Sequence, residues 1–101
     1  MHSESQLNGD VFKAAIKDRL TFSDHAEFRK LLDQVNKSGA HKCVFDLSKL
    51  AAVDSAGLGM FIIALQESKK SGWSLTLRAP QERVLALMTL AKFDKMLTIE
   101  S

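Results

Sequence analysis

Two polar residues stand directly before the most apolar stretch of the chain. Asp54 and Ser55 lie in the segment VDSAGLG, and the run MFIIAL that follows is the longest apolar run of the 101 residues. Apolar spacing predicts a helix over residues 55–71, so the acid and the hydroxyl fall at its start. The unpaired N–H groups and the positive dipole end there favour a hydroxyl, a carboxylate or a phosphate. The pair could cap the helix, or Ser55 could accept a phosphate.

A catalytic serine is not supported by the residues around Ser55. A nucleophile elbow would read G-x-S-x-G, and Val53 stands where its first glycine is needed. None of the three histidines has a sequence feature that nominates it as a base for the hydroxyl. Ile62 replaces the third glycine of a G-x-G-x-x-G pattern, and no Cys or His spacing fits a metal. We therefore expect no enzyme activity, no cofactor and no metal.

Two glycines follow the serine within the predicted helix. Gly57 and Gly59 each cost about 1 kcal/mol of helix propensity relative to alanine. Such glycines are understandable where another backbone or a partner protein approaches closely, or where the helix packs tightly on its own sheet. A phosphate on Ser55 would add roughly two negative charges beside Asp54 without requiring a change of fold.

The surrounding pattern alternates strands and helices, which predicts a single α/β domain over residues 11–101, preceded by a polar tail over residues 1–10. We expect a mixed, mostly parallel sheet of about four to five strands flanked by helices. The expected elements are a strand over 11–16 that turns or bends through KDR into LTF, a helix over 23–39, a strand over 43–47, the helix over 55–71, a strand over 73–78, a helix after Pro80 and a short closing strand within 93–99.

Each predicted helix has an apolar stripe. For the first helix, Asp24 and Glu27 fit a capping box, Phe22 fits a hydrophobic staple and Gly39 fits the stop. The stripes are Phe28, Leu31, Leu32 and Val35 in the first helix, Leu58, Phe61, Ile62 and Leu65 in the second, and Val84, Leu87, Met88 and Ala91 in the third.

Charge, hydropathy and cysteine content limit the classes of partner and the cellular compartment that we expect for the protein. The net charge is only +2 and is spread along the chain, so we expect no nucleic-acid binding. The polar N-terminus has no signal-peptide pattern, and the longest apolar run is far shorter than the roughly 20 residues that span a bilayer. We expect a cytoplasmic protein without membrane insertion. Cys43, the single cysteine, is expected to be a buried small hydrophobe.

Three segments of the chain together match a known domain pattern. FDLS at residues 45–48 ends an apolar strand, VDSAGLG at residues 53–59 opens a long helix, and LAKFDKMLTI comes late in the chain. Over about residues 11–99 the chain resembles STAS domains of the bacterial anti-sigma factor antagonist type. One departure is Asp18, because the family often has a glycine before the Arg-Leu pair of the first crossover.

The resemblance implies a function in reversible protein binding. Family members bind an anti-sigma factor that is a histidine-kinase-like (HPK-like) serine kinase when their serine is bare. Phosphorylation at the position of Ser55 disrupts the complex, and a PP2C-type phosphatase restores it. The partner-binding residues that the resemblance implies are Asp54, Ser55, Ala56, Gly57, Leu58 and Gly59.

Two other functions remain open from the sequence. STAS domains also serve transporters and lipid-transport complexes, where Ser55 would only cap the helix without switching. From a different class, the helix N-terminus could bind the anionic group of a small ligand or nucleotide.

Overall fold

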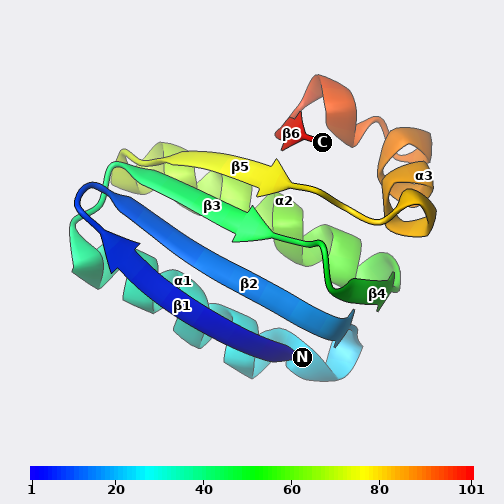
Figure 1. Ribbon diagram of the computed structural model, residues 1–101, viewed down its shortest axis with the longest axis horizontal. Helices are drawn as coiled ribbons and strands as arrows, with labels where there is room; N and C mark the ends of the chain where they lie inside the picture. Colours follow the sequence, from blue (N-terminus) through cyan, green and yellow to red (C-terminus); the bar gives the residue numbers. More distant parts are fainter.

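Strands and helices alternate along most of the chain (Figure 1). The computed structural model describes residues 1–101. Its elements are β1 (His2–Asn8), β2 (Val11–Leu20), the 3₁₀ helix η1 (Phe22–Asp24), α1 (His25–Ser38), β3 (Lys42–Asp46), β4 (Leu50–Val53), α2 (Ser55–Ser71), β5 (Ser74–Arg78), α3 (Glu82–Leu90), the 3₁₀ helix η2 (Phe93–Lys95) and β6 (Thr98–Glu100).

The predicted mixed, mostly parallel sheet is confirmed and has six strands. The strand order is β1-β2-β3-β5-β6, and β4 pairs with the last part of β2. Only β1 runs antiparallel to its neighbour. Helices α1 and α2 lie side by side on one face of the sheet, and α3 lies at its end beside β4 (Figure 1). Right-handed crossovers explain the placement of α1 and α2, because the connections β2-α1-β3 and β4-α2-β5 advance along the sheet in the same direction and so lie over the same face.

The core lies between the sheet and the two covering helices. Phe28 of α1, Phe45 of β3 and Phe61 of α2 are buried and meet at its centre. The ring of Phe28 stands edge-on to both others, with centroid separations of 5.9 Å to Phe45 and 6.2 Å to Phe61. Edge-to-face aromatic packing adds to the hydrophobic stabilisation of these contacts. Helix α2 is therefore anchored in the core through Phe61, and this anchoring fixes the position of its first turn.

The first ten residues differ from the sequence expectation. The polar tail forms strand β1, which pairs with β2 from His2 opposite Lys17 to Asn8 opposite Val11. Every residue of β1 is exposed, so no apolar pattern marked it as a strand. The available signal was the Gly9-Asp10 dipeptide, which forms the two-residue turn between Asn8 and Val11 and in which Gly9 adopts a φ of +59°.

Strand β2 bends near its end, which is the second of the two alternatives left open by the sequence. Residues 11–20 form one strand, and the register with β4 shifts between Asp18 and Arg19. Asp18 has a φ of +69°, a left-handed conformation that glycine adopts most easily and that aspartate tolerates better than most residues. The short strand β4, which no sequence pattern indicated, pairs beyond this bend and leads the chain directly to Asp54.

The start of α1 corrects two expectations, whereas its apolar stripe and its end at Gly39 are confirmed. The carboxylate of Asp24 accepts a hydrogen bond from the N–H of Thr21 at 2.8 Å, so the capping box closes on Thr21 rather than on Glu27. The side chain of Phe22 is 74% exposed and does not act as a staple. The 3₁₀ turn η1, inserted before α1, directs this ring outward.

The bounds predicted for α2 are confirmed, but its buried stripe is rotated. Of the predicted stripe only Phe61 is fully buried, and Leu58, Ile62 and Leu65 are half-buried. Almost every residue over 56–65 is apolar, so the spacing could not select one face. The side that meets the sheet is instead rich in small residues, since its buried members are Gly57, Met60, Phe61, Ala64 and Ser68. In α3, only Val84 and Met88 of the predicted stripe are buried.

Candidate functional site

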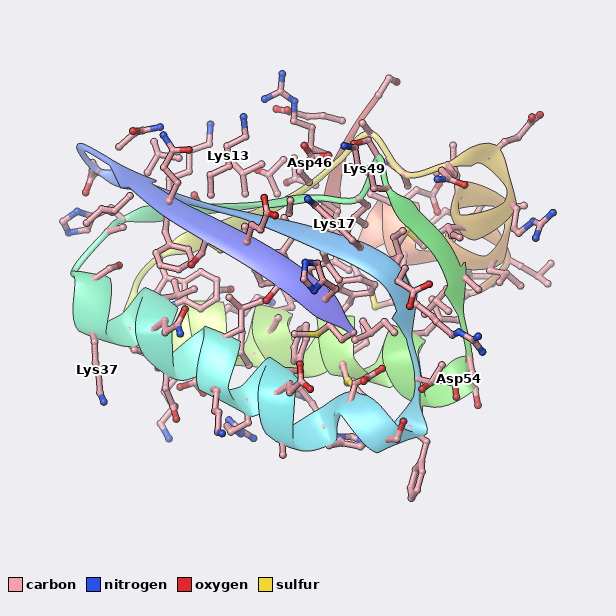
Figure 2. All side chains as sticks on the ribbon, turned by 60° about the horizontal axis from the view of Figure 1, so that its bottom comes forward. Lys13, Lys17, Lys37, Asp46, Lys49 and Asp54 are labelled. Carbon is pink, nitrogen blue, oxygen red and sulfur yellow. The ribbon has the colours of Figure 1, made fainter.

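The site predicted from the sequence is the junction between β4 and α2. Asp54 is the N-cap of α2 and has extended backbone, and its Oδ1 accepts a hydrogen bond from the N–H of Gly57 at 2.7 Å. Its Oδ2 accepts a second hydrogen bond from the N–H of Phe22 at 3.1 Å. Figure 2 shows Asp54 at the start of α2, beside the end of β2. One carboxylate therefore joins the helix start to the turn that precedes α1.

Ser55 is the first residue of α2 and does not cap it. The residue is exposed, and its hydroxyl makes no hydrogen bond within the chain. The capping alternative for this serine is therefore wrong, because Asp54 already satisfies the backbone donor that a capping hydroxyl would take. The hydroxyl of Ser55 is consequently uncommitted and faces solvent at the helix start.

The two glycines of the motif have opposite surroundings. A Cβ built on Gly57 would collide with the carbonyl oxygen of Leu20 and would lie 2.5 Å from Cγ2 of Val53. Gly57 is buried, so it allows the helix to pack against β2 and β4 rather than offering a surface to a partner. A Cβ on Gly59 would meet no atom within 4 Å. Gly59 therefore leaves open space on the outer side of the first turns of α2.

The other four motif residues differ in their exposure. Ala56 and Leu58 are half-buried, whereas Asp54, Ser55 and Gly59 are exposed. The accessible part of the predicted surface is therefore a small polar and glycine-lined corner with the edge of one leucine. It has neither the depth nor the apolar lining typical of a small-molecule pocket.

Sequence reasoning missed the side chain of Phe22 as a neighbour of this corner. Its backbone N–H binds the Asp54 carboxylate, and its ring stands edge-on to the ring of His25 with centroids 6.1 Å apart. No sequence pattern distinguishes an outward phenylalanine from a staple at this position, because the difference depends on the inserted 3₁₀ turn. The pairing of Asp54 with a residue 32 positions earlier is likewise a product of the fold.

The candidate chemistry around the site is limited. No histidine hydrogen-bonds the hydroxyl of Ser55, and His41 instead contacts Asp10 at 2.8 Å at an exposed position. Cys43 is buried, as expected, and desolvation raises the pKa of its thiol to about 12. No group of three or more His, Cys, Asp or Glu side chains is placed to hold a metal ion. None of the helices is both long and apolar enough to cross a membrane.

The face of the sheet opposite α1 and α2 is polar. Lys13, Lys17, Asp46 and Lys49 extend from this face in Figure 2. Lys17 lies 3.2 Å from the carboxylate of Glu4, so cations and carboxylates alternate there. The N–H of Ser48, which donates to Oδ1 of Asp46 at 3.0 Å, holds the pKa of that carboxyl below its ordinary value. This face does not carry a continuous basic patch.

A mixed sheet with α1 and α2 on one face, and a capped helix start that exposes a serine, defines a small α/β domain with a polar corner at one end of its sheet. Residues 4–98 match the family model described as "Mlab, STAS domain". The chain therefore belongs to the STAS domain family, and the resemblance noted from the sequence is confirmed.

Solved structures show the same fold at low sequence identity. The chain is similar to TM1081 of Thermotoga maritima, assigned as an anti-sigma factor antagonist, with a TM-score of 0.88, 23% identity, and coverage of 97% of this chain and 85% of that one. An anti-sigma factor antagonist from Mycobacterium paratuberculosis matches with a TM-score of 0.78 and 17% identity, and the match covers 98% of this chain and 84% of that one. The phosphorylated form of the Bacillus cell fate determinant SpoIIAA matches with a TM-score of 0.74 and 10% identity, and the match covers 99% of this chain and 92% of that one.

Proposed function

We propose that this chain is an anti-sigma factor antagonist-like regulator that works by partner switching. The unphosphorylated chain binds an HPK-like serine kinase that acts as an anti-sigma factor, or a related switch protein, in the cytoplasm. The kinase transfers phosphate to Ser55, which releases the complex, and a PP2C-type phosphatase removes it. The partner-facing surface is centred on Asp54, Ser55, Ala56, Leu58 and Gly59, and Gly57 positions the helix from beneath.

The observation that carries this proposal is the free hydroxyl of Ser55. A serine at a helix start ordinarily caps the helix, and a capping hydroxyl is partly withdrawn from chemistry. Here Asp54 caps the helix with Oδ1 and accepts the N–H of Phe22 with Oδ2, and Ser55 is exposed beside it. A kinase can reach the hydroxyl without unfolding the helix, and the added phosphate places about two negative charges at the docking corner.

The fold comparisons support a switch that acts through charge. SpoIIAA matches this chain in its unphosphorylated form with a TM-score of 0.73 and in its phosphorylated form with 0.74. The fold of that protein is thus shared between its two forms. We expect the same here, because the position of Ser55 is solvent-exposed and its hydroxyl holds no contact that phosphorylation would break. Repulsion and loss of fit at the interface then release the partner.

The small-ligand alternative is less well supported by the geometry. An anion site at a helix start needs free N–H groups, and Asp54 already occupies the N–H of Gly57 with its own carboxylate. A bound anion would also meet that negative charge at close range. The corner around Ser55 therefore suits a protein surface better than a free phosphate group.

The test is a phosphorylation assay with the purified HPK-like serine kinases of the organism that encodes this chain. The chain is incubated with each kinase and ATP, and the modified residue is located by mass spectrometry. We expect one phosphate, on Ser55, and none on the Ser55→Ala variant. Ser71→Ala is the matched control, because Ser71 is an exposed serine at the other end of the same helix.

The outcomes separate the proposed function from its alternatives. Phosphate on Ser55 in the wild type and in Ser71→Ala supports the proposal. Phosphate at another residue, or none in the presence of a kinase that modifies a control substrate, would overturn it. The second result would favour a non-switching STAS module of a transporter or lipid-transport complex.

A further inference from the structure

One aromatic side chain of the domain lies outside the core. The chain has seven aromatic residues, and six of them are buried. Phe22 alone is exposed, with 74% of its surface accessible. Single exposed apolar residues are common and carry no meaning by themselves. The setting of Phe22 is what distinguishes it.

The backbone of Phe22 is fixed from two sides. The preceding residue, Thr21, and Asp24 close the η1 turn through reciprocal hydrogen bonds of 2.8 Å and 2.9 Å. The N–H of Phe22 itself donates to Oδ2 of Asp54 at 3.1 Å. On its outer side the ring meets only the edge of His25 among the aromatic residues. Three hydrogen bonds therefore fix the backbone that carries this exposed ring.

The same carboxylate connects this ring to the phosphorylation site. Asp54 binds the backbone of Phe22 with one oxygen and the first turn of α2 with the other, directly before Ser55. An aromatic residue on a preorganised backbone loses little conformational freedom when it is buried by a partner, which is the character of an interface hot spot. The exposed ring and the exposed hydroxyl thus form two fixed points on one corner.

We infer that Phe22 is an anchor residue that inserts into an apolar pocket on the serine kinase, beside the cleft that receives Ser55. This inference rests on the proposed function and deepens it by naming how the partner is held. The anchor supplies affinity and orientation, and Ser55 supplies the switch. An apolar pocket is the chemistry that fits, because the ring carries no charge and presents most of its surface.

The test compares Phe22→Ala, Phe22→Leu and the wild type in calorimetric titrations with the purified HPK-like kinase that phosphorylates this chain. Phe22→Ala should weaken binding by about 30-fold, the size of a hot-spot loss. Phe22→Leu should recover most of that loss. Leu7→Ala is the matched control, since Leu7 is also exposed but pairs with Phe12 at the opposite end of β2. Its affinity should equal that of the wild type.

Phosphorylation kinetics give a second readout that a purely structural role would not produce. In Phe22→Ala the KM of the kinase for the chain should rise by about the same 30-fold, with kcat unchanged, because Ser55 and its cap are intact. Wild-type affinity and KM in Phe22→Ala, with Ser55 still phosphorylated, would overturn the anchor and leave the proposed function standing. Absence of any binding or phosphorylation of the wild type would overturn both.

Discussion

Replacement by alanine should lower the stability of the domain at Gly57 and raise it at Gly59. At Gly57 the added Cβ would collide with the carbonyl oxygen of Leu20 and lie 2.5 Å from Val53 Cγ2, where ordinary contacts are 3.4 Å or longer. The helix start must therefore move outward by about 1 Å, because close-packed interiors do not yield locally. That movement also strains the hydrogen bond from the N–H of Asp54 to the same carbonyl, now 3.3 Å.

The magnitude follows from two opposing effects. Overpacking of this kind costs about 3 kcal/mol when a backbone atom is the obstacle. The gain in helix propensity offsets about 1 kcal/mol. Gly57→Ala should therefore lower the free energy of unfolding by about 2 kcal/mol, which corresponds to about 10 °C in Tm for a domain of this size. Gly59→Ala has only the gain, so it should raise stability by up to about 1 kcal/mol.

The assay is urea unfolding followed by the fluorescence of Trp73. This residue is the only tryptophan and is 5% exposed, so its emission reports loss of the core. The two variants carry the same chemical change at positions two residues apart on one helix, so the difference between them measures the space around each glycine. A Gly57→Ala variant as stable as Gly59→Ala would refute the argument that the helix start touches β2 at Gly57.

Three further outcomes test other parts of the structure. Asp54→Ala should lower the free energy of unfolding in urea by about 2 kcal/mol, because the N–H groups of Gly57 and Phe22 lose their acceptor. An unchanged urea midpoint would contradict the capping role of Asp54. Cys43, with its pKa raised to about 12, should not react with a thiol reagent near pH 8 until urea unfolds the chain. The N–H of Ser48 lowers the pKa of Asp46 in the folded chain. The contribution of this carboxylate to the free energy of unfolding is therefore full above its ordinary pKa of 3.8 and is lost as the pH falls through its lower pKa in the folded chain. Asp46→Asn should therefore flatten the acid limb of stability against pH, and an identical limb in both proteins would disprove this.

Much of the architecture was predictable because apolar periodicity and turn residues act locally. The bounds of α2 and the strand at Ser74–Arg78 follow from such patterns, and the glycine stop of α1 is visible as Gly39. Strand β1 was not predictable from apolar periodicity, because all of its side chains are exposed and it is stabilised by backbone pairing with β2. Strand β4 was missed because it is four residues long, and its pairing with the bent end of β2 is set by tertiary structure.

The candidate site was predictable in position but not in its internal roles. The residues Asp54 and Ser55 were identified as a helix start, and a single sequence does not reveal which of them caps it. The roles of Gly57 and Gly59 differ only because one faces the sheet and the other faces solvent. The involvement of Phe22 depends on a hydrogen bond across 32 positions, which no local pattern contains.

The central claim is that charge gained on the exposed hydroxyl of Ser55 releases a docked kinase while the fold stays the same. The most direct measurement is a calorimetric titration of the HPK-like kinase with the chain bearing genetically encoded phosphoserine at position 55, compared with the unmodified chain. The account predicts that the unmodified chain binds and that the phosphorylated chain binds about 100-fold more weakly, as expected for a coupling of this kind. Equal affinities for the two forms would contradict it.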